Sequence, residues 1–290
     1  FRKMVTQVDE VFTENFDVFL NSTFCSSLVS NANKSVYITS FPHKEVSPEF
    51  LDSYLFLHNS NYTKKWAKRF WGEHYNELLF PILEMGVSNV EKFDRKESEI
   101  IRFISIGRFT QSGHNKQQDF IIEAFKCAQK SSNTNAELFL CGSVNNKSKE
   151  DMEYVHSLEK RANKSIHIET NITFENLESR LLGSDFYLHA TGVGVDSDAS
   201  PEKFEHFGIT IVGALSHGVY PIAFNVGGPA QTIKDLGVGS LYKDKNELIA
   251  IIVESMNQHK RRIKVSNDVL KPYVDNNIDT IKKLEKFISE

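Results

Sequence analysis

The stretch PEKFEHFGITIVGALSHGVYPIAFNVGG, residues Pro201–Gly228, holds an acidic side chain, a helix start, a short apolar strand and a glycine turn in close succession. Glu205 comes just before a helix that is predicted to open at Phe207-Gly208, and the strand is predicted over Val219–Phe224. Because a helix start exposes backbone N–H groups and the positive end of the helix dipole, it can hold a phosphate group. The stretch therefore predicts an anion-binding helix start beside a carboxylate.

The same alternation of strand and helix extends through the sequence from residue 100 onward. Apolar positions that recur with the helical period separate short apolar runs, as in the helix that carries Phe120, Ile121, Ala124, Phe125 and Ala128. Thr173 is placed to cap another helix, which is predicted to run to Leu182. This order predicts a doubly wound α/β fold whose ligands bind at the carboxyl ends of parallel strands. The strands are predicted at Ile100–Gly107, Glu137–Gly142, Ser165–Glu169, Asp185–Ala190 and Val219–Phe224.

The part before residue 84 follows a β-α-β order of its own. A helix there places Tyr62, Trp66 and Phe70 on one face, and Gly72 ends it. The polar, aperiodic residues 84–99 are typical of a linker between domains. The last helix is predicted to be amphipathic, with Ile278, Ile281, Leu284, Phe287 and Ile288 on one side. Strands are predicted at Phe16–Leu20, Ser35–Phe41, Tyr54–Ser60 and Asn76–Ile82.

Composition excludes several classes of protein. With 290 residues, a net charge of −4 and no long basic run, the chain gives no electrostatic reason to expect nucleic-acid binding. The basic group Lys64, Lys65, Lys68 and Arg69 is either a solvated helix face or a contact with an anionic membrane surface. No apolar run approaches the roughly 20 residues that span a bilayer. Three separated cysteines suggest neither a disulfide framework nor a zinc site.

Two cationic residues follow the strand that ends at Gly107. A glycine there lets the backbone approach a ligand, Arg108 offers a planar fork for phosphate oxygens, and Lys116 adds a movable positive charge. Together they would neutralise a departing diphosphate. The alternative is that both are solvated surface residues.

The loop from His189 to Gly208 is the second candidate. Its start, with Gly192 and Gly194, can cradle a phosphate or a sugar, although it lacks the third glycine of a dinucleotide fingerprint. His189 is either a base or a strand-end histidine bonded to backbone. Asp196 and Asp198 have the spacing of a metal-binding pair, but exposed carboxylates in such a loop favour solvation, so no metal is expected.

The turn Gly227-Gly228, followed by Pro229 at a first helical position, is the third candidate, and a plain strand-to-helix turn explains it equally well. Taken together and in this order, the three loops resemble the C-terminal domain of a retaining nucleotide-sugar glycosyltransferase of the GT-B fold, in the large family-4 group. The resemblance is carried by SIGRF, GHNKQQDFIIEAF, ELFLCGS, SDFYLHATGVG, PEKFEHFGITIV and PIAFNVGG, which cover roughly residues 100–241.

The resemblance implies a role for single residues. Arg108 and Lys116 match the pair that grips the donor diphosphate, and Glu205 matches the first glutamate of a two-glutamate motif, which is expected to bind the donor sugar. These three are the predicted catalytic residues. The expected donor-binding residues are Gly107, then Ile172, Thr173 and Leu177 around the nucleobase, and Phe207, Gly208 and Ile209 at the helix start.

The resemblance also implies the domain organisation. Residues 1–86 look like the second half of an N-terminal, acceptor-side α/β domain, 87–99 like the linker and 100–290 like the nucleotide-sugar-binding domain. In this fold the last helix, about 277–289, commonly crosses back to the first domain. If these 290 residues are the whole polypeptide, a partner chain would have to supply the missing half of the N-terminal domain.

One position departs from the family pattern. The second glutamate of the motif would lie at position 213, where this sequence has Gly213. That carboxylate is expected to accept from the ribose hydroxyls, and losing a charged hydrogen bond costs about 1.5–3 kcal/mol, or roughly one to two orders of magnitude in affinity. A glycine inside a helix costs about another 1 kcal/mol. Gly213 therefore implies a different ribose contact, a changed donor, or a weakened or inactive enzyme.

The function that the resemblance implies is transfer of a hexosyl unit, with retention, from a nucleotide-diphosphate sugar to a glycan or lipid-linked acceptor in cell-surface polysaccharide synthesis. No cofactor or metal is expected. The expected location is the cytoplasm, with peripheral contact at the inner membrane face as an option. The rival hypothesis is a non-catalytic glycosyltransferase-like subunit that binds a glycan or a partner chain, which Gly213 and the missing half-domain favour. A nucleotide-sugar epimerase of similar fold is a weaker third reading.

Overall fold

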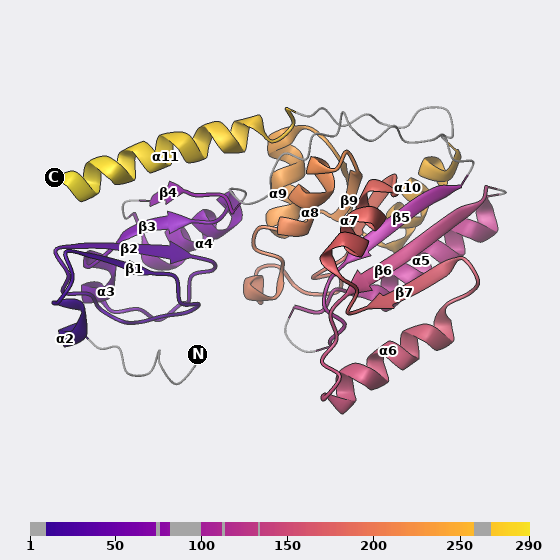
Figure 1. The fold of residues 1–290 in the computed structure, drawn as a ribbon, viewed down its shortest axis with the longest axis horizontal. Coiled ribbons are helices and arrows are strands. Elements are labelled where there is room, and N and C mark those ends of the chain that lie inside the picture. The colour runs from indigo at the N-terminus through magenta and orange to yellow at the C-terminus, as the bar shows by residue number, and fades with distance from the viewer. Residues whose placement is uncertain (1–9, 74–75, 82–99, 112–113, 133, 258–267) are drawn as a thin grey trace. The chain divides into compact units, whose positions relative to one another are not determined.

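The computed structural model divides the chain into two compact units (Figure 1). The first unit is Phe1–Leu83 together with Lys271–Glu290, and the second is Glu84–Leu270. The predicted linker, 87–99, lies outside the described residues, so the predicted domain boundaries stay predictions. The structure describes residues 10–73, 76–81, 100–111, 114–132, 134–257 and 268–290.

The first unit contains a parallel sheet with the strand order β1-β2-β3-β4. Each strand forms within or beside a run that the sequence predicts as a strand. Its core is aromatic, because Tyr37 and Phe56 from the sheet pack with Phe50 and Trp71 from the helices. The elements are α2 (Glu10–Thr13), β1 (Val18–Asn21), β2 (Lys34–Thr39), α3 (Pro48–Asp52), β3 (Leu55–His58), α4 (Asn61–Trp71), β4 (Asn76–Leu78) and α11 (Lys271–Ser289).

Helix α4 forms as its sequence predicts. Ser60 caps its start by accepting from the Thr63 amide at 3.1 Å. Gly72 ends it with a φ of 81°, a conformation that glycine adopts at little cost. The predicted row of rings is present, with Trp66 in contact with both Tyr62 and Phe70.

Of the five apolar residues predicted on the buried face of α11, three are half-buried and two are exposed. Ile278 and Ile288 are 46% and 41% exposed, whereas Asn277 is fully buried. The Asn277 side chain donates to the Phe80 carbonyl at 2.8 Å and accepts from the Phe80 amide at 2.9 Å, and Thr280 Oγ1 donates to the Leu78 carbonyl at 2.8 Å. The backbone at the end of β4 needs hydrogen-bond partners, so polar side chains take some of the most buried positions of this helix.

The second unit contains a parallel sheet with the strand order β10-β9-β8-β5-β6-β7. Strands β5, β6 and β7 run side by side in Figure 1. The direction of winding reverses between β5 and β8, which makes this the topological switch point where ligands bind in such sheets. The strands are β5 (Ile101–Ile106), β6 (Ala136–Gly142), β7 (Ile166–Thr170), β8 (Phe186–His189), β9 (Tyr220–Phe224) and β10 (Ser240–Tyr242).

The helices of this unit follow the predicted pattern, with two corrections. The run from Leu241 to Met256 is predicted from its sequence to carry one helix, but Leu241-Tyr242 belongs to β10, because Tyr242 is buried in the sheet core. Pro229 is the third residue of its helix and not the first, because Gly227 and Gly228 are already helical. The helices are α5 (Gln118–Ser131), α6 (Lys149–Arg161), α7 (Phe174–Leu182), α8 (Ile209–Ser216), α9 (Gly227–Leu236) and α10 (Lys245–Asn257), with a 3-10 turn at Pro201–Lys203.

The apolar residues that recur with the helical period in α5 are the ones that pack in the core. Ile121, Ala124, Phe125 and Ala128 are fully buried, and Phe120 is partly buried against the same core. The predicted cap of α7 is also present, since Thr173 Oγ1 accepts from the Asn176 amide at 3.3 Å. Among the described residues, no helix combines the length and the apolar character that crossing a membrane requires.

Candidate functional site

The candidate site lies at the carboxyl edge of the second sheet. The loop after β5 carries Gly107, Arg108 and Lys116, and the loop after β8 runs from His189 to Glu205. Because β5 and β8 are parallel neighbours, their carboxyl ends meet at one edge. The structure therefore brings these two predicted loops together at the switch point of the sheet.

Lys116 and Glu205 form an ion pair across these two loops. Their side chains are only 18% and 21% exposed, so water screens the pair weakly. Burial by itself would raise the pKa of the Glu205 carboxyl, but the neighbouring His189 and the charge of Lys116 outweigh burial and hold that pKa well below its ordinary value. Glu205 is therefore an anion throughout the neutral range.

The turn Gly227-Gly228 holds the backbone of Glu205. The Gly228 amide donates to the Glu205 carbonyl at 2.8 Å. A β-carbon on Gly228 would lie 2.1 Å from the His206 carbonyl oxygen, and one on Gly227 would lie 2.7 Å from that of Glu205. Only glycine fits where the two backbones approach so closely. The third predicted loop thus fixes the position of the Glu205 backbone.

The side-chain stem of Lys116 packs over Gly107, which directly follows β5. A β-carbon on Gly107 would lie 2.5 Å from Lys116 Cγ, so glycine leaves the space that the lysine stem occupies. The chain then turns into α5 through Gln117, whose φ of 55° is supported by a 2.7 Å hydrogen bond from its amide to Asn115 Oδ1. These contacts direct the ammonium group of Lys116 toward Glu205.

Arg108, the second predicted cation, stands outside this ion pair. Its side chain is exposed at the carboxyl end of β5. Burial is the main cause of the lowered pKa of His114, the charge of Glu205 opposes it, and the charges of Lys116 and Arg108 lower that pKa further, so Arg108 lies in the same neighbourhood. An exposed guanidinium at this edge is available to an anionic ligand.

The start of α8 is fixed by buried contacts. Phe207 is buried and Gly208 is the N-cap with a φ of 85°, while Ile209 is exposed. Tyr187, fully buried on β8, donates to Thr210 Oγ1 at 2.7 Å and anchors the first turn. The amide groups that open this helix therefore lie close to Glu205 in sequence and are held in place by the sheet.

The predicted nucleobase residues lie on the same edge but on another strand. Ile172, Thr173 and Leu177 follow β7, which is separated from β8 by β5 and β6, or roughly 14 Å at the usual strand spacing. The structure does not bring them into contact with Glu205. Phe174, which is not among the predicted residues, is the first residue of α7 and is 73% exposed. An aromatic residue directly after a helix cap was the available signal.

Position 213, where a second glutamate was expected, lies inside α8. Gly213 is buried within α8, and its carbonyl accepts from Ser216 Oγ at 2.9 Å and lies 2.7 Å from His217 Nδ1. His217 Nε2 lies 3.8 Å from the carboxylate of Glu178 on α7. A carboxylate thus approaches this turn of α8 from the neighbouring helix.

The loop pair Asp196 and Asp198 has a structural explanation. Asp196 Oδ1 accepts from the amides of Asp198 and Ala199 at 2.9 and 3.0 Å, which folds the loop onto itself. Within the described ranges, no three His, Cys, Asp or Glu side chains are grouped so that they could hold a metal ion. That the protein works without a metal stays a prediction.

His206, next to Glu205, predicts a pH dependence of stability. Burial, together with the neighbouring His114, lowers its pKa to about 4. The unfolded chain, in which histidine titrates near pH 6.5, then binds more protons than the folded chain between about pH 6.5 and 4, so stability falls as the pH is lowered through this window, by up to about 3 kcal/mol. His206→Gln should flatten this loss.

Urea unfolding followed by circular dichroism measures this effect. Both tryptophans, Trp66 and Trp71, belong to the first unit, so tryptophan fluorescence does not report on the second. His156→Gln, on the exposed side of α6, is the matched control and should keep the wild-type pH profile. Parallel profiles for wild type and His206→Gln would contradict the prediction.

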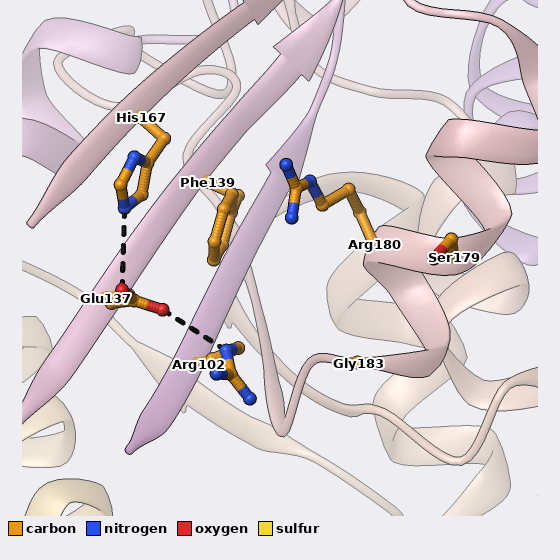
Figure 2. Close-up of a pocket in the computed structure, with 7 residues that line it drawn as sticks. All are labelled: Arg102, Glu137, Phe139, His167, Ser179, Arg180 and Gly183. Atoms are coloured by element: carbon orange, nitrogen blue, oxygen red, sulfur yellow. Dashed lines mark hydrogen bonds and ion pairs between the residues drawn. The ribbon is translucent and has the colours of Figure 1, made fainter.

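A pocket of about 370 Å³ is lined by residues of β5, β6, β7 and α7 (Figure 2). Arg102, Glu137 and His167 are each the second residue of β5, β6 and β7, near the amino ends. Glu137 accepts from Arg102 at 3.2 Å and lies 3.7 Å from His167 Nε2, and the Arg180 guanidinium lies over the Phe139 ring at 4.6 Å. Glu137 pairs with Arg102 and His167, and Arg180 pairs with Glu169, which explains these charges as stabilising contacts of the sheet edge.

Comparisons with known proteins agree with this geometry. The profile of the family "Glycosyl transferases group 1" matches residues 89–268. The alpha-1,3/1,6-mannosyltransferase of Saccharomyces cerevisiae is 25% identical over 205 residues, which cover 62% of this chain and 40% of that protein. The same enzyme of Dictyostelium discoideum is 27% identical, covering 91% and 62%. The chain thus spans between about two fifths and three fifths of the length of these curated relatives.

Solved structures share the fold. A glycosyltransferase of Rickettsia africae superposes with a TM-score of 0.66 at 16% identity, covering 98% of this chain and 79% of that one. The HepE protein of Anabaena, solved in complex with UDP, superposes with a TM-score of 0.62 at 16% identity, covering 87% and 72%. At these identities the likeness establishes the α/β architecture with two parallel sheets of GT-B glycosyltransferases.

Proposed function

This chain belongs to the group 1 glycosyl transferases, and from that premise we propose that it takes part in moving a mannosyl unit from a nucleotide-diphosphate sugar to a glycan or lipid-linked acceptor, with retention at the anomeric carbon. The observation that carries the proposal is the partly buried pair of Lys116 and Glu205 at the switch point of the sheet. One member is a cation for a diphosphate and the other an acceptor for sugar hydroxyls.

The chemistry requires that negative charge on the departing diphosphate be stabilised as the sugar–phosphate bond breaks. Lys116 and Arg108 supply positive charge, and the start of α8 supplies backbone amides. Glu205, held as an anion, accepts hydrogen bonds from the sugar that is transferred. These groups perform the task with the chain's own residues.

The choice of mannose rests on the curated relatives. Two of them are alpha-1,3/1,6-mannosyltransferases, and a third, from Caenorhabditis elegans, carries the donor GDP-Man and a dolichol-linked glycan acceptor in its name at 23% identity. The structural relatives include complexes with UDP and with UDP and glucose, so a UDP-sugar is the alternative donor. The proposed site of action is the cytoplasmic membrane face, where the basic residues of α4 would contact anionic lipid.

Calorimetric titration of the full chain with GDP-mannose, GDP, UDP-glucose and UDP tests the proposal. Saturable binding of one nucleotide sugar, with the matching nucleotide binding more weakly, is the expected result. The rival, a non-catalytic subunit, is favoured by Gly213. Failure of all four compounds to bind would favour that rival and overturn the proposed donor site.

A further inference from the structure

His189, at the end of β8, is a buried histidine whose ring nitrogens have no hydrogen-bond partner among the described residues. Its side chain is 4% exposed. A buried polar group without a partner is costly, and most such groups in native proteins are satisfied. The His189 ring therefore lies where it could form a hydrogen bond that it does not form with any described residue.

The Glu205 carboxylate lies beside the His189 ring. His189 Nε2 lies 3.9 Å from Glu205 Oε2, which is contact distance but too long for a hydrogen bond. Lys116 pairs with this same oxygen of Glu205. The Lys116 ammonium thus pairs with Oε2, and the His189 imidazole lies near the same oxygen without a hydrogen bond to it.

While Lys116 and Glu205 are paired with each other, Lys116 cannot serve the diphosphate. If Lys116 moves to the diphosphate, Glu205 loses its cation, and an unpaired carboxylate in a mostly buried place is strongly unfavourable. A shift of about 1 Å would bring His189 Nε2 into hydrogen-bond distance of Oε2. The backbone of His189 is fixed meanwhile, because its carbonyl accepts from the Tyr242 hydroxyl at 2.9 Å.

We propose that His189 is a positioning residue that takes over Glu205 from Lys116 when the nucleotide sugar binds, and so keeps the carboxylate directed at the sugar. The inference rests on the proposed function. The neutral imidazole donates from Nε2, and burial supports this form because it lowers the pKa of His189. Lys116 is thereby free to serve the diphosphate without leaving Glu205 unpaired.

Titration of His189 variants with GDP and with GDP-mannose tests this role. His189→Leu should bind GDP like the wild type, within about twofold, but bind GDP-mannose roughly tenfold more weakly, because only the sugar depends on Glu205. His189→Gln, which retains a side-chain N–H donor, should recover most of the affinity. In a Glu205→Ala background, His189→Leu should cost nothing further. His167→Leu, on β7, is the matched control.

Several outcomes would overturn the inference. Equal weakening toward GDP and GDP-mannose, no weakening at all, or additive effects in the double variant would each show that His189 does not act through Glu205. If His189→Leu fails to fold, nitrogen NMR of the wild-type imidazole decides: GDP-mannose should shift the Nε2 resonance, and an unchanged resonance refutes the role. If the wild type binds neither GDP-mannose nor UDP-glucose, the proposed function fails first and this inference with it.

Discussion

Replacing Lys116 by alanine is expected to weaken the binding of GDP-mannose by roughly 10- to 100-fold, the effect of losing one charge-assisted hydrogen bond. Turnover of the bound donor should fall further, by about 100-fold or more, because the charge that develops on the leaving diphosphate loses its cation. The variant also leaves Glu205 in its mostly buried place without its ion-pair partner. Calorimetry measures the first effect, and release of GDP from GDP-mannose measures the second.

The Lys116 experiment has a matched control in the helix that follows Lys116. Lys130→Ala, on the exposed side of α5, removes the same charge from the same unit and should leave binding and turnover unchanged. Circular dichroism establishes that Lys116→Ala is folded. Donor binding and turnover within about twofold of the wild type would refute the assignment of Lys116 to the diphosphate.

Replacing Gly228 by alanine is expected to destabilise the second unit by about 1–3 kcal/mol or more, as overpacking does in well-packed interiors. The new methyl group would lie 2.1 Å from the His206 carbonyl oxygen, and that neighbour is backbone, which cannot rotate away. The loop must therefore move, and the 2.8 Å hydrogen bond from the Gly228 amide to the Glu205 carbonyl is lost or lengthened. GDP-mannose should bind more weakly as a result.

Chemical unfolding followed by circular dichroism measures the stability effect, and calorimetry measures the affinity. Gly183→Ala is the control, because a β-carbon there would meet its nearest neighbour, the Ser179 carbonyl oxygen, at 3.3 Å, and its φ of −81° suits any residue. A Gly228→Ala protein as stable as Gly183→Ala would show that the loop tolerates the added methyl group.

The α/β architecture of this protein could be predicted from its sequence because strands and helices are local. The apolar runs and the helical period around Phe125 depend on residues a few positions apart, and so do the caps Ser60 and Thr173. The sequence predictions differ from the structure where a segment that is distant in the sequence determines the local structure. Strand β10 forms because it pairs with β9, and α11 turns Asn277 inward because the backbone at Phe80 needs its amide.

The candidate site, like the fold, could be predicted from the sequence only in part. The residue types and their order along the chain single out Lys116 and Glu205 as candidate ligand-binding residues, because charge and the position after a strand can be read from the sequence. That these two form an ion pair, 89 positions apart, follows only from the parallel pairing of β5 with β8. Sequence patterns carry no information on which strands become neighbours at the switch point, so the contact could not be read from them.

The stretch Pro201–Gly228 shows both contributions at once. By itself it determined that a carboxylate stands before a helix start and that two glycines follow a strand, since these features depend on neighbouring residues. Only the tertiary structure decided that the glycines support Glu205 and that His189 lies buried 3.9 Å from its carboxylate. The physical reason is that close backbone approach and burial are properties of segments that meet in space, which the chain brings together only when it folds.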